Sequence, residues 1–325
     1  VTPCNHVMGG RGMNPAGSEY NEFRIQPRTN RSIDPVDYTR NFEAFLEDKP
    51  RGEPFCFQLL TKEPHREFKP GTGLGSGKKL EDVQVPTFLP DTPEIRSDLL
   101  DYAYEIEWFD QHLARCLDIL EKRGELENTI VIVTSDNGMA FPSAKALCTE
   151  YGVHVPLAIS WDGRFKHGEV VDVPVSLIDI YPTLFDLLKI PLPEVLPVAG
   201  GSLGPLLLAG GGKEHAVDNN AVYSGRERHS SSRWKNLGYP QRCIRTEQYL
   251  YIWNFRPERW PAGSPKQYAA NGELICGYCD VDSVTVRGVS TSTIVIDEKD
   301  DPAIAPYFQL AYGKRPQEEL YDILE

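Results

Sequence analysis

The sequence has no apolar run approaching about 18 residues, so it predicts no membrane-spanning helix. It also has no excess of positive charge, because 34 Lys and Arg face 47 Asp and Glu, giving a net charge of −13. Phosphate backbones bind to basic surfaces, so this balance argues against a nucleic acid as the main partner. A polyanionic substrate would need a local cationic pocket.

Two further absences concern the ends of the chain and its cysteines. No signal peptide precedes Val1, and residues 320–325 read as ordered structure stopped within an element, so we expect both ends to be cut. A missing leader then indicates no compartment. The seven cysteines cannot all pair within the chain because their number is odd. Cys56, Cys116 and Cys243 stand among apolar neighbours, which predicts buried thiols.

The composition is that of a folded protein. Hydrophobic residues make up 40% and charged residues 25% of the 325 residues, enough for about two domains with real cores. Composition shifts at two glycine-rich stretches, 199–202 and 209–212. We take this shift as a boundary between an α/β part, residues 1–212, and a smaller α+β subdomain, residues 213–325.

Hydrophobic periodicity predicts the elements of the α/β part. Helices are expected at 38–48, from Pro93 to about Gly124, and at 179–188, and strands at 54–60, 129–134 and 155–161. The order favours a mixed sheet flanked by helices. Residues 129–134 are apolar on both faces, which is typical of a strand covered on both sides. Beyond the boundary, antiparallel strands are expected at 221–224, 248–253 and 292–296.

The helix after Asp91-Thr92-Pro93 has the clearest pattern. Asp91 or Thr92 can cap it and Pro93 suits its first turn. Gly124 can end it. Apolar residues recur along it at steps of three and four, which predicts one buried stripe. The stripe comprises Ile95, Leu99, Tyr102, Ile106, Phe109, Leu113, Leu117 and Leu120.

Polar residues follow the strand predicted at 129–134. Ligands in open α/β sheets bind outside the carboxyl ends of the strands, and Asp136 and Asn137 stand at such an end. Carboxylate and amide oxygens are hard ligands suited to Ca²⁺ or Mg²⁺. The alternative is a plain turn, since Asp136-Asn-Gly138 is also turn chemistry.

Two basic side chains lie near strand ends. His65 follows the strand predicted at 54–60 and could act as a general acid or hold an anionic oxygen. Lys145 follows the Asp136 turn at short range and could place a positive charge beside anything bound there. Taken alone, each residue is more simply explained as a solvated surface side chain.

Five segments together resemble the sulfatase family of the alkaline-phosphatase superfamily. They are Glu63-Pro-His65-Arg66, Thr134-Ser-Asp-Asn-Gly138, Ser176-Leu-Ile-Asp-Ile-Tyr-Pro-Thr-Leu184, Gly201-Ser-Leu-Gly-Pro-Leu-Leu207 and Glu319-Leu-Tyr-Asp322. Within the family, Asp136-Asn-Gly-x-x-Phe-Pro-Ser143 and Gly225-Arg-Glu-Arg-His229 are most similar to heparan N-sulfatases and their bacterial relatives. The resemblance implies an alkaline-phosphatase-like α/β fold.

The resemblance also implies residue roles. Asp136 and Asn137 would ligate one calcium ion, and His65 and Lys145 would contact the sulfate, with His65 able to protonate the leaving group. The heparan N-sulfatase branch commonly has Arg where Lys145 stands, which weakens the assignment to that branch and leaves the charge role intact. Arg226 and His229 would wall the pocket from the second part and contact a sugar, or form a polar surface loop.

One part of the family pattern is missing from the sequence. The family nucleophile is a formylglycine made from Cys or Ser in a C/S-x-P-x-R segment, and neither this segment nor the N-terminal Asp-Asp metal pair occurs. Calcium takes about six to eight oxygen ligands, more than Asp136, Asn137 and a sulfate can supply. We therefore expect a chain shortened at its N-terminus by on the order of a hundred residues or more.

The expected function is hydrolysis of sulfate esters or sulfamates on a sulfated sugar or glycosaminoglycan. The family suggests a periplasmic, secreted or lysosomal location. Two alternatives remain, a phosphodiesterase or phosphatase of the same superfamily and an inactive binding or remnant fragment. The sulfatase hypothesis requires the Asp136 turn, the His65 imidazole and the Lys145 ammonium to converge.

Overall fold

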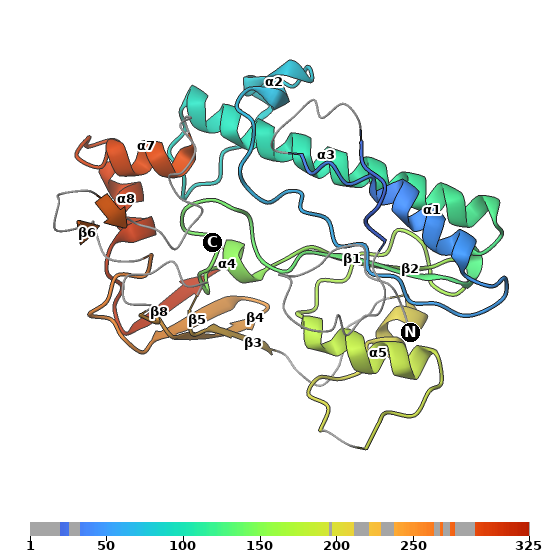
Figure 1. Ribbon diagram of the computed structural model, residues 1–325. Helices are drawn as coiled ribbons and strands as arrows, with labels where there is room; N and C mark the ends of the chain where they lie inside the picture. Colours follow the sequence, from blue (N-terminus) through green and yellow to red (C-terminus); the bar gives the residue numbers. More distant parts are fainter. Residues whose placement is uncertain are drawn as a thin grey trace. The chain divides into compact units, whose positions relative to one another are not determined.

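The computed structural model describes residues 20–25, 33–194, 197–210, 221–228, 237–262, 267–268, 274–276 and 290–324 (Figure 1). The chain divides into two compact units. The first comprises Val1–Leu126 and Val284–Glu298, and the second Glu127–Ser283 and Lys299–Glu325. The main break between these units follows Leu126. The predicted division of the chain into residues 1–212 and 213–325 stays a prediction.

The first unit is built on one long helix, α3 (Pro93–Lys122). The other helices of this unit are α1 (Tyr38–Asp48), α2 (Thr72–Gly75), η1 (Leu80–Asp82) and α7 (Thr291–Asp297). Figure 1 shows α1 running along α3, and the two helices share a core of Phe42, Phe45, Leu46, Cys116 and Leu120. The helices predicted at 38–48 and from Pro93 are therefore confirmed.

The buried face of α3 differs from the predicted stripe. Ile106 of that stripe is 40% exposed, whereas four polar side chains of the helix are buried, namely Asp98, Asp101, Glu105 and His112. Asp101 accepts the backbone N–H groups of Gly71 at 2.9 Å and Gly73 at 2.7 Å. A Cβ on Gly73 would lie 2.4 Å from the Leu100 carbonyl carbon, so only glycine allows this approach. These hydrogen bonds thus compensate the burial of the Asp101 carboxylate.

Two strand predictions in this unit are wrong. Residues 54–60 form no strand in the described part, although their side chains alternate as in one: Phe55, Phe57 and Leu59 pack on the α1–α3 core and Cys56 is exposed. The expected burial of the Cys56 thiol is also wrong, while Cys116 and Cys243 are buried. Residues 291–297 form α7 rather than a strand. The Ser290 side chain caps the Thr293 N–H, and Asp98 accepts the Thr291 N–H and hydroxyl at the helix start.

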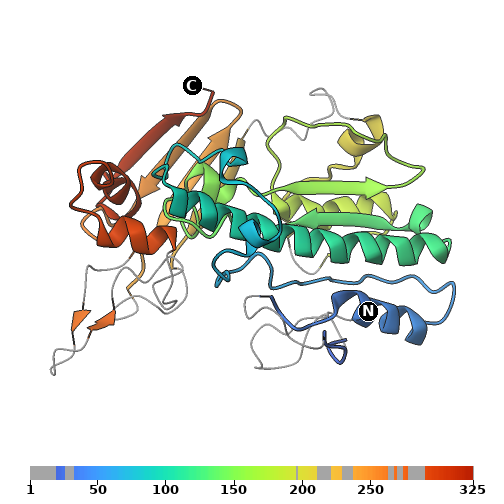
Figure 2. The same ribbon diagram turned by 90° about the horizontal axis from the view of Figure 1, so that it is seen from above.

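The second unit contains the sheets. Strands β1 (Ile130–Thr134) and β2 (Leu157–Trp161) pair antiparallel with Ile132 opposite Ile159, and Figure 2 shows them as adjacent green arrows. The residues of β1 up to Val133 are half-buried on both faces, less covered than predicted. A second, four-stranded antiparallel sheet has the order β3-β4-β5-β8. Its strands are β3 (Ala221–Arg226), β4 (Gln241–Thr246), β5 (Tyr249–Asn254) and β8 (Glu318–Asp322).

Short elements complete the described chain. They are η2 (Leu126–Asn128), α4 (Glu150–Val153), η3 (Leu177–Asp179), α5 (Ile180–Leu187), α6 (Gly204–Ala209), β6 (Gln267–Tyr268), β7 (Leu274–Cys276) and α8 (Ala305–Tyr312). The predicted mixed α/β class with an antiparallel C-terminal sheet is confirmed. Within the described ranges, no helix is long and apolar enough to cross a membrane.

Candidate functional site

The turn that follows β1 is held by its own side chains. The Ser135 hydroxyl donates to the Asn137 carbonyl at 2.8 Å, and the Asn137 amide donates to Asp136 Oδ1 at 2.8 Å. The Asp136 side chain is exposed at the strand end. The sequence thus places a carboxylate and an amide side by side, as predicted, within a turn that is held by hydrogen bonds of its own side chains.

Gly138 fixes this turn against α4. Its N–H donates to the Gly152 carbonyl at 3.1 Å. A Cβ on Gly138 would lie 1.9 Å from the Tyr151 carbonyl oxygen, a distance that no side chain can occupy. A Cβ on Gly152 would lie 2.2 Å from the Leu147 carbonyl oxygen. Close backbone approach at both glycines therefore folds residues 138–153 back under the strand end.

Lys145 lies within this folded-back segment and is only 4% exposed. Buried lysines are rare, and this one is surrounded in sequence by Phe141 and Ala144, which are fully buried. Ser143 and Ala146 flank it with φ of 65° and 64°, values that non-glycine residues seldom adopt. Strain of this kind clusters at functional sites, which supports a role for this loop beyond packing.

His65 stands in the first unit, in the loop after residues 54–60. Its side chain is exposed, and its Nδ1 lies 2.6 Å from the Arg66 carbonyl oxygen. Beside it, the buried Glu63 accepts the Asp34 N–H at 2.7 Å and the Tyr38 hydroxyl at 2.9 Å. Burial raises the pKa of Glu63 and, with the help of the Glu63 charge, that of Tyr38. The His65 loop is therefore anchored by a buried carboxyl–phenol pair.

Sequence reasoning missed this anchor and the buried acids of α3. Asp98, Asp101, Glu105 and His112 follow each other at steps of three, four and seven residues, which places them on one helix face. That spacing was readable from the sequence. Ile95 and Leu120 of the predicted stripe are buried, so the apolar pattern found part of the buried face, and the acidic residues beside it carried no apolar signal.

Arg226 and His229 are the two residues that were predicted to wall the pocket from the C-terminal part of the chain. The Arg226 guanidinium donates to the Tyr239 carbonyl at 3.2 Å and the Pro261 carbonyl at 2.9 Å, and lies 5.5 Å from the Tyr239 ring centroid. Arg226 thus fastens the segment before β4 to residue 261, and its predicted contact with a sugar stays a prediction. His229 lies outside the described residues.

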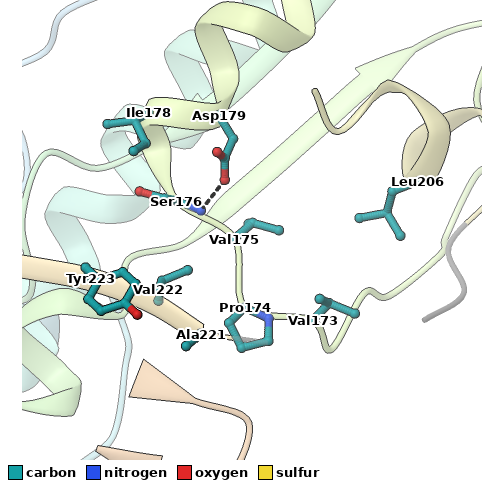
Figure 3. A pocket seen from close by; sticks show the side chains of 10 residues that line it. All are labelled: Val173, Pro174, Val175, Ser176, Ile178, Asp179, Leu206, Ala221, Val222 and Tyr223. Carbon is teal, nitrogen blue, oxygen red and sulfur yellow. Dashed lines mark hydrogen bonds between the residues drawn. The ribbon is translucent and has the colours of Figure 1, made fainter. Parts of the chain in front are cut away.

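The later motif segments have a structural explanation. Asp179 accepts the Ser176 N–H at 2.8 Å and the Gly201 N–H at 2.9 Å, and Asp186 accepts the Ser202 hydroxyl at 2.6 Å. These bonds join residues 176–187 to residues 201–204. A small cavity of about 80 Å³ lies beside them, and its wall is mostly apolar (Figure 3). No predicted site residue lines this cavity, so we assign it no part in the site.

The predicted calcium ion would need oxygen ligands, and the turn after β1 is where the sequence predicts them. The β1 turn offers oxygens of Asp136 and Asn137, which are of the type calcium prefers. Within the described ranges, no three His, Cys, Asp or Glu side chains gather where they could hold a metal ion. The turn therefore fits part of a calcium shell, and the remaining ligands would have to come from elsewhere.

The predicted residues divide between the two units. Asp136 and Asn137 are in direct contact, and Lys145 lies in the segment that folds under their turn. All three belong to the second unit, whereas His65 belongs to the first. Their convergence with His65 stays a prediction.

Comparison with solved structures defines the fold. A 2-O glycosaminoglycan sulfatase matches with a TM-score of 0.53 and 18% identity, over 71% of this chain and 58% of that one. A phosphonate monoester hydrolase from Silicibacter pomeroyi matches with a TM-score of 0.53 and 17% identity, over 83% of this chain and 57% of that one. The fold is thus one that sulfatases and phosphonate monoester hydrolases share.

Sequence comparison gives the family. Residues 10–190 match the sulfatase family model, and the chain belongs to the sulfatase family. Human N-sulphoglucosamine sulphohydrolase is 32% identical over 181 residues, which cover 53% of this chain and 34% of that protein. The chain therefore spans about a third of the length of this relative. His65, Asp136, Asn137 and Lys145 all lie within the matched range.

Proposed function

We propose that this chain carries part of the active site of a calcium-dependent sulfatase that removes sulfate from a sulfated sugar. The observation that supports it most is the turn after β1, where Asp136 and Asn137 present adjacent oxygens and Gly138 leaves no room for a side chain. Such a construction holds two hard ligands at a strand end, inside the range that matches the sulfatase family.

The residues of this chain would share the work as follows. The buried Lys145 ammonium supplies a positive point charge for a sulfate oxygen. His65 donates its Nδ1–H to the Arg66 carbonyl, which leaves Nε2 as the nitrogen that faces a substrate. When doubly protonated, the ring can pass the Nε2 proton to the departing oxygen or nitrogen.

A calcium ion bound by Asp136 and Asn137 would neutralise charge on the sulfate oxygens. The sequence contains no C/S-x-P-x-R segment, so we propose that the formylglycine nucleophile comes from a segment outside these 325 residues. The substrate class follows from the relatives, because N-sulphoglucosamine sulphohydrolase is the named activity of one and 2-O glycosaminoglycan sulfatase that of another. We therefore propose a sulfated amino sugar or glycosaminoglycan, as ester or sulfamate.

The test uses the complete gene product and its Asp136→Asn variant. Initial rates of sulfate release from N-sulfated and O-sulfated glucosamine are measured together with bound calcium. We expect the variant to lose at least about a hundredfold in rate, as removal of a key electrostatic group does, and to lose its calcium. Asp162→Asn is the matched control, because Asp162 follows β2 as Asp136 follows β1 and its carboxylate pairs with the exposed His167.

Two results would contradict the proposal. One is an Asp136→Asn enzyme with unchanged rate and calcium content. The other is a gene that encodes no C/S-x-P-x-R segment upstream of Val1. Two zinc ions per chain, with turnover of phosphate esters only, would favour the phosphatase alternative instead.

A further inference from the structure

Arg66, the residue after His65, is held by a buried ion pair. Its Nη1 donates to Asp98 Oδ1 at 2.8 Å and its Nη2 to Asp98 Oδ2 at 2.6 Å. The two side chains are only 9% and 5% exposed. The Arg66 guanidinium also lies 4.3 Å from the Phe68 ring centroid. This two-pronged geometry fixes the guanidinium in both position and plane.

Asp98 is itself held from a second side. Its Oδ2 accepts the Thr291 N–H at 2.9 Å and the Thr291 hydroxyl at 2.6 Å, at the first residue of α7. Asp98 stands in the first turns of α3, a helix of 30 residues, so its backbone is rigid. Four hydrogen bonds thus converge on one carboxylate. Buried ion pairs contribute little net stability, so a positional role is the more informative explanation.

The fixed Arg66 bears directly on the His65 ring. The Arg66 carbonyl oxygen lies 2.6 Å from His65 Nδ1, and a carbonyl can only accept. The contact therefore requires a hydrogen on Nδ1. In the neutral ring this leaves Nε2 without a hydrogen, the reverse of the Nε2–H form that an isolated histidine side chain favours. On the other side, the His65 N–H donates to the Lys62 carbonyl at 2.8 Å, which fixes the backbone of the loop.

We propose that Asp98 is a positioning residue, which holds the Arg66 carbonyl through the Arg66 side chain and thereby sets the tautomer of His65. The importance of this tautomer for catalysis rests on the proposed function, because it depends on His65 acting on the substrate. The tautomer itself does not depend on that function. It can be measured on the chain as it stands.

The test is ¹⁵N NMR of the chain labelled at its histidine rings. Spectra are recorded at about pH 8.5, where an ordinary imidazole is neutral. A His65→Gln variant identifies the His65 signals. We expect His65 to show the Nδ1–H pattern in the parent chain. We expect Asp98→Asn to lose that pattern and revert towards Nε2–H.

Three further variants make the result specific. Asp91→Asn breaks the Arg96–Asp91 pair, which is also two-pronged but exposed, and should leave His65 unchanged. Thr291→Val removes the hydroxyl bond from α7 while Arg66 keeps Asp98, and should also leave His65 unchanged. Arg66→Lys cannot form the two-pronged pair with Asp98 and should shift the His65 tautomer as Asp98→Asn does. This variant tests the positioning role if Asp98→Asn does not fold.

An unchanged tautomer in folded Asp98→Asn or Arg66→Lys chains would overturn the proposal. An equal shift in Thr291→Val would overturn it as well, because docking of α7 would then control the ring. A different result would overturn the proposed function without affecting the proposal about the tautomer. If the complete His65→Gln enzyme kept its full rate, the catalytic assignment would fall while the tautomer result, and with it the positioning role of Asp98, would stand.

Discussion

Glu150 and Arg245 form a two-pronged ion pair that ties the segment carrying Lys145 to the C-terminal sheet. Arg245 Nη2 donates to Glu150 Oε1 at 2.9 Å and its Nε to Oε2 at 3.1 Å, joining the first residue of α4 to β4. Both side chains are about four-fifths buried. Burial alone would raise the pKa of Glu150, but the hydrogen bonds from Arg245 and His154 hold it below its usual value.

Replacing Arg245 should therefore destabilise the second unit. Arg245→Met leaves a largely buried carboxylate without its main partner, and we expect the free energy of unfolding to fall by about 1–3 kcal/mol. Urea unfolding followed by circular dichroism measures the change. Arg256→Met is the control, because its pair with Glu258 is exposed and screened by water, so its loss should have a much smaller effect. Equal effects of the two variants would mean that the Glu150 pair is not important for stability.

The β1 turn should not accept any side chain at Gly138. A Cβ there would lie 1.9 Å from the Tyr151 carbonyl oxygen, so Gly138→Ala must move backbone. Overpacking of this kind costs about 1–3 kcal/mol or more. Thermal unfolding compares this variant with Gly75→Ala, where nothing lies within 4 Å of the added Cβ. If both variants melted together, residues 138–153 would not be packed as described.

His112 should make the first unit sensitive to acid. The ring is fully buried in α3, with Nδ1 2.8 Å from the Thr39 hydroxyl and Nε2 without a partner in the described chain. Burial, assisted by the Arg115 charge, lowers the pKa of His112 to about 4. Between that value and the ordinary 6.5, the unfolded chain binds the proton and the folded chain does not. This contribution to stability is therefore complete above pH 6.5 and falls as the pH drops towards 4, by about 3 kcal/mol.

The measurement is the unfolding free energy of the parent and of His112→Gln from pH 4 to pH 8. The unfolding free energy of the parent minus that of His112→Gln should become smaller, or negative, below pH 6. His167→Gln serves as the control, because its side chain is 75% exposed and should leave the pH profile unaltered. A parent and a His112→Gln profile that stay parallel would contradict the burial of a neutral ring.

The described cysteines should differ in reactivity. Cys56 is exposed, whereas Cys116 is buried and burial raises its pKa to about 12. Because the thiolate is the reactive form, iodoacetamide at pH 8 should modify Cys56 within minutes and reach Cys116 only after unfolding. Peptide mapping by mass spectrometry gives the extent at each site. Equal labelling of the two in the folded chain would contradict the packing of α1 on α3.

The sequence predicted best what local chemistry determines. Thr92 caps α3 as expected, accepting the Ile95 N–H, and the β1 turn lies where the hydrophobic run ends. It predicted worst what a distant partner decides. Residues 291–297 have strand composition, yet Asp98, nearly 200 positions away in the chain, accepts both the Thr291 N–H and its hydroxyl and docks a helix there. No window of sequence contains that contact.

The candidate site likewise combines features that the sequence predicted with features that it could not predict. The pattern around Asp136 and Asn137 could be read directly, because the two oxygens are adjacent in the chain. The burial of Lys145 could not, since it depends on the glycine contacts that fold residues 138–153 back on themselves. The anchor of His65 was missed for a related reason. Tyr38 bonds Glu63, and Asp98 bonds Arg66, only in the folded unit, because the partners of each pair come from separate segments.

Under the proposed function, the His65 ring and the Lys145 ammonium would act on one sulfate group beside the Asp136 turn. A crystal structure of the complete gene product with a bound sulfated glucosamine tests this most directly. We expect His65 Nε2 and Lys145 Nζ within hydrogen-bond distance of the same sulfate, with Asp136 and Asn137 ligating a calcium ion beside it. A substrate bound with its sulfate away from either side chain would rule out their shared role.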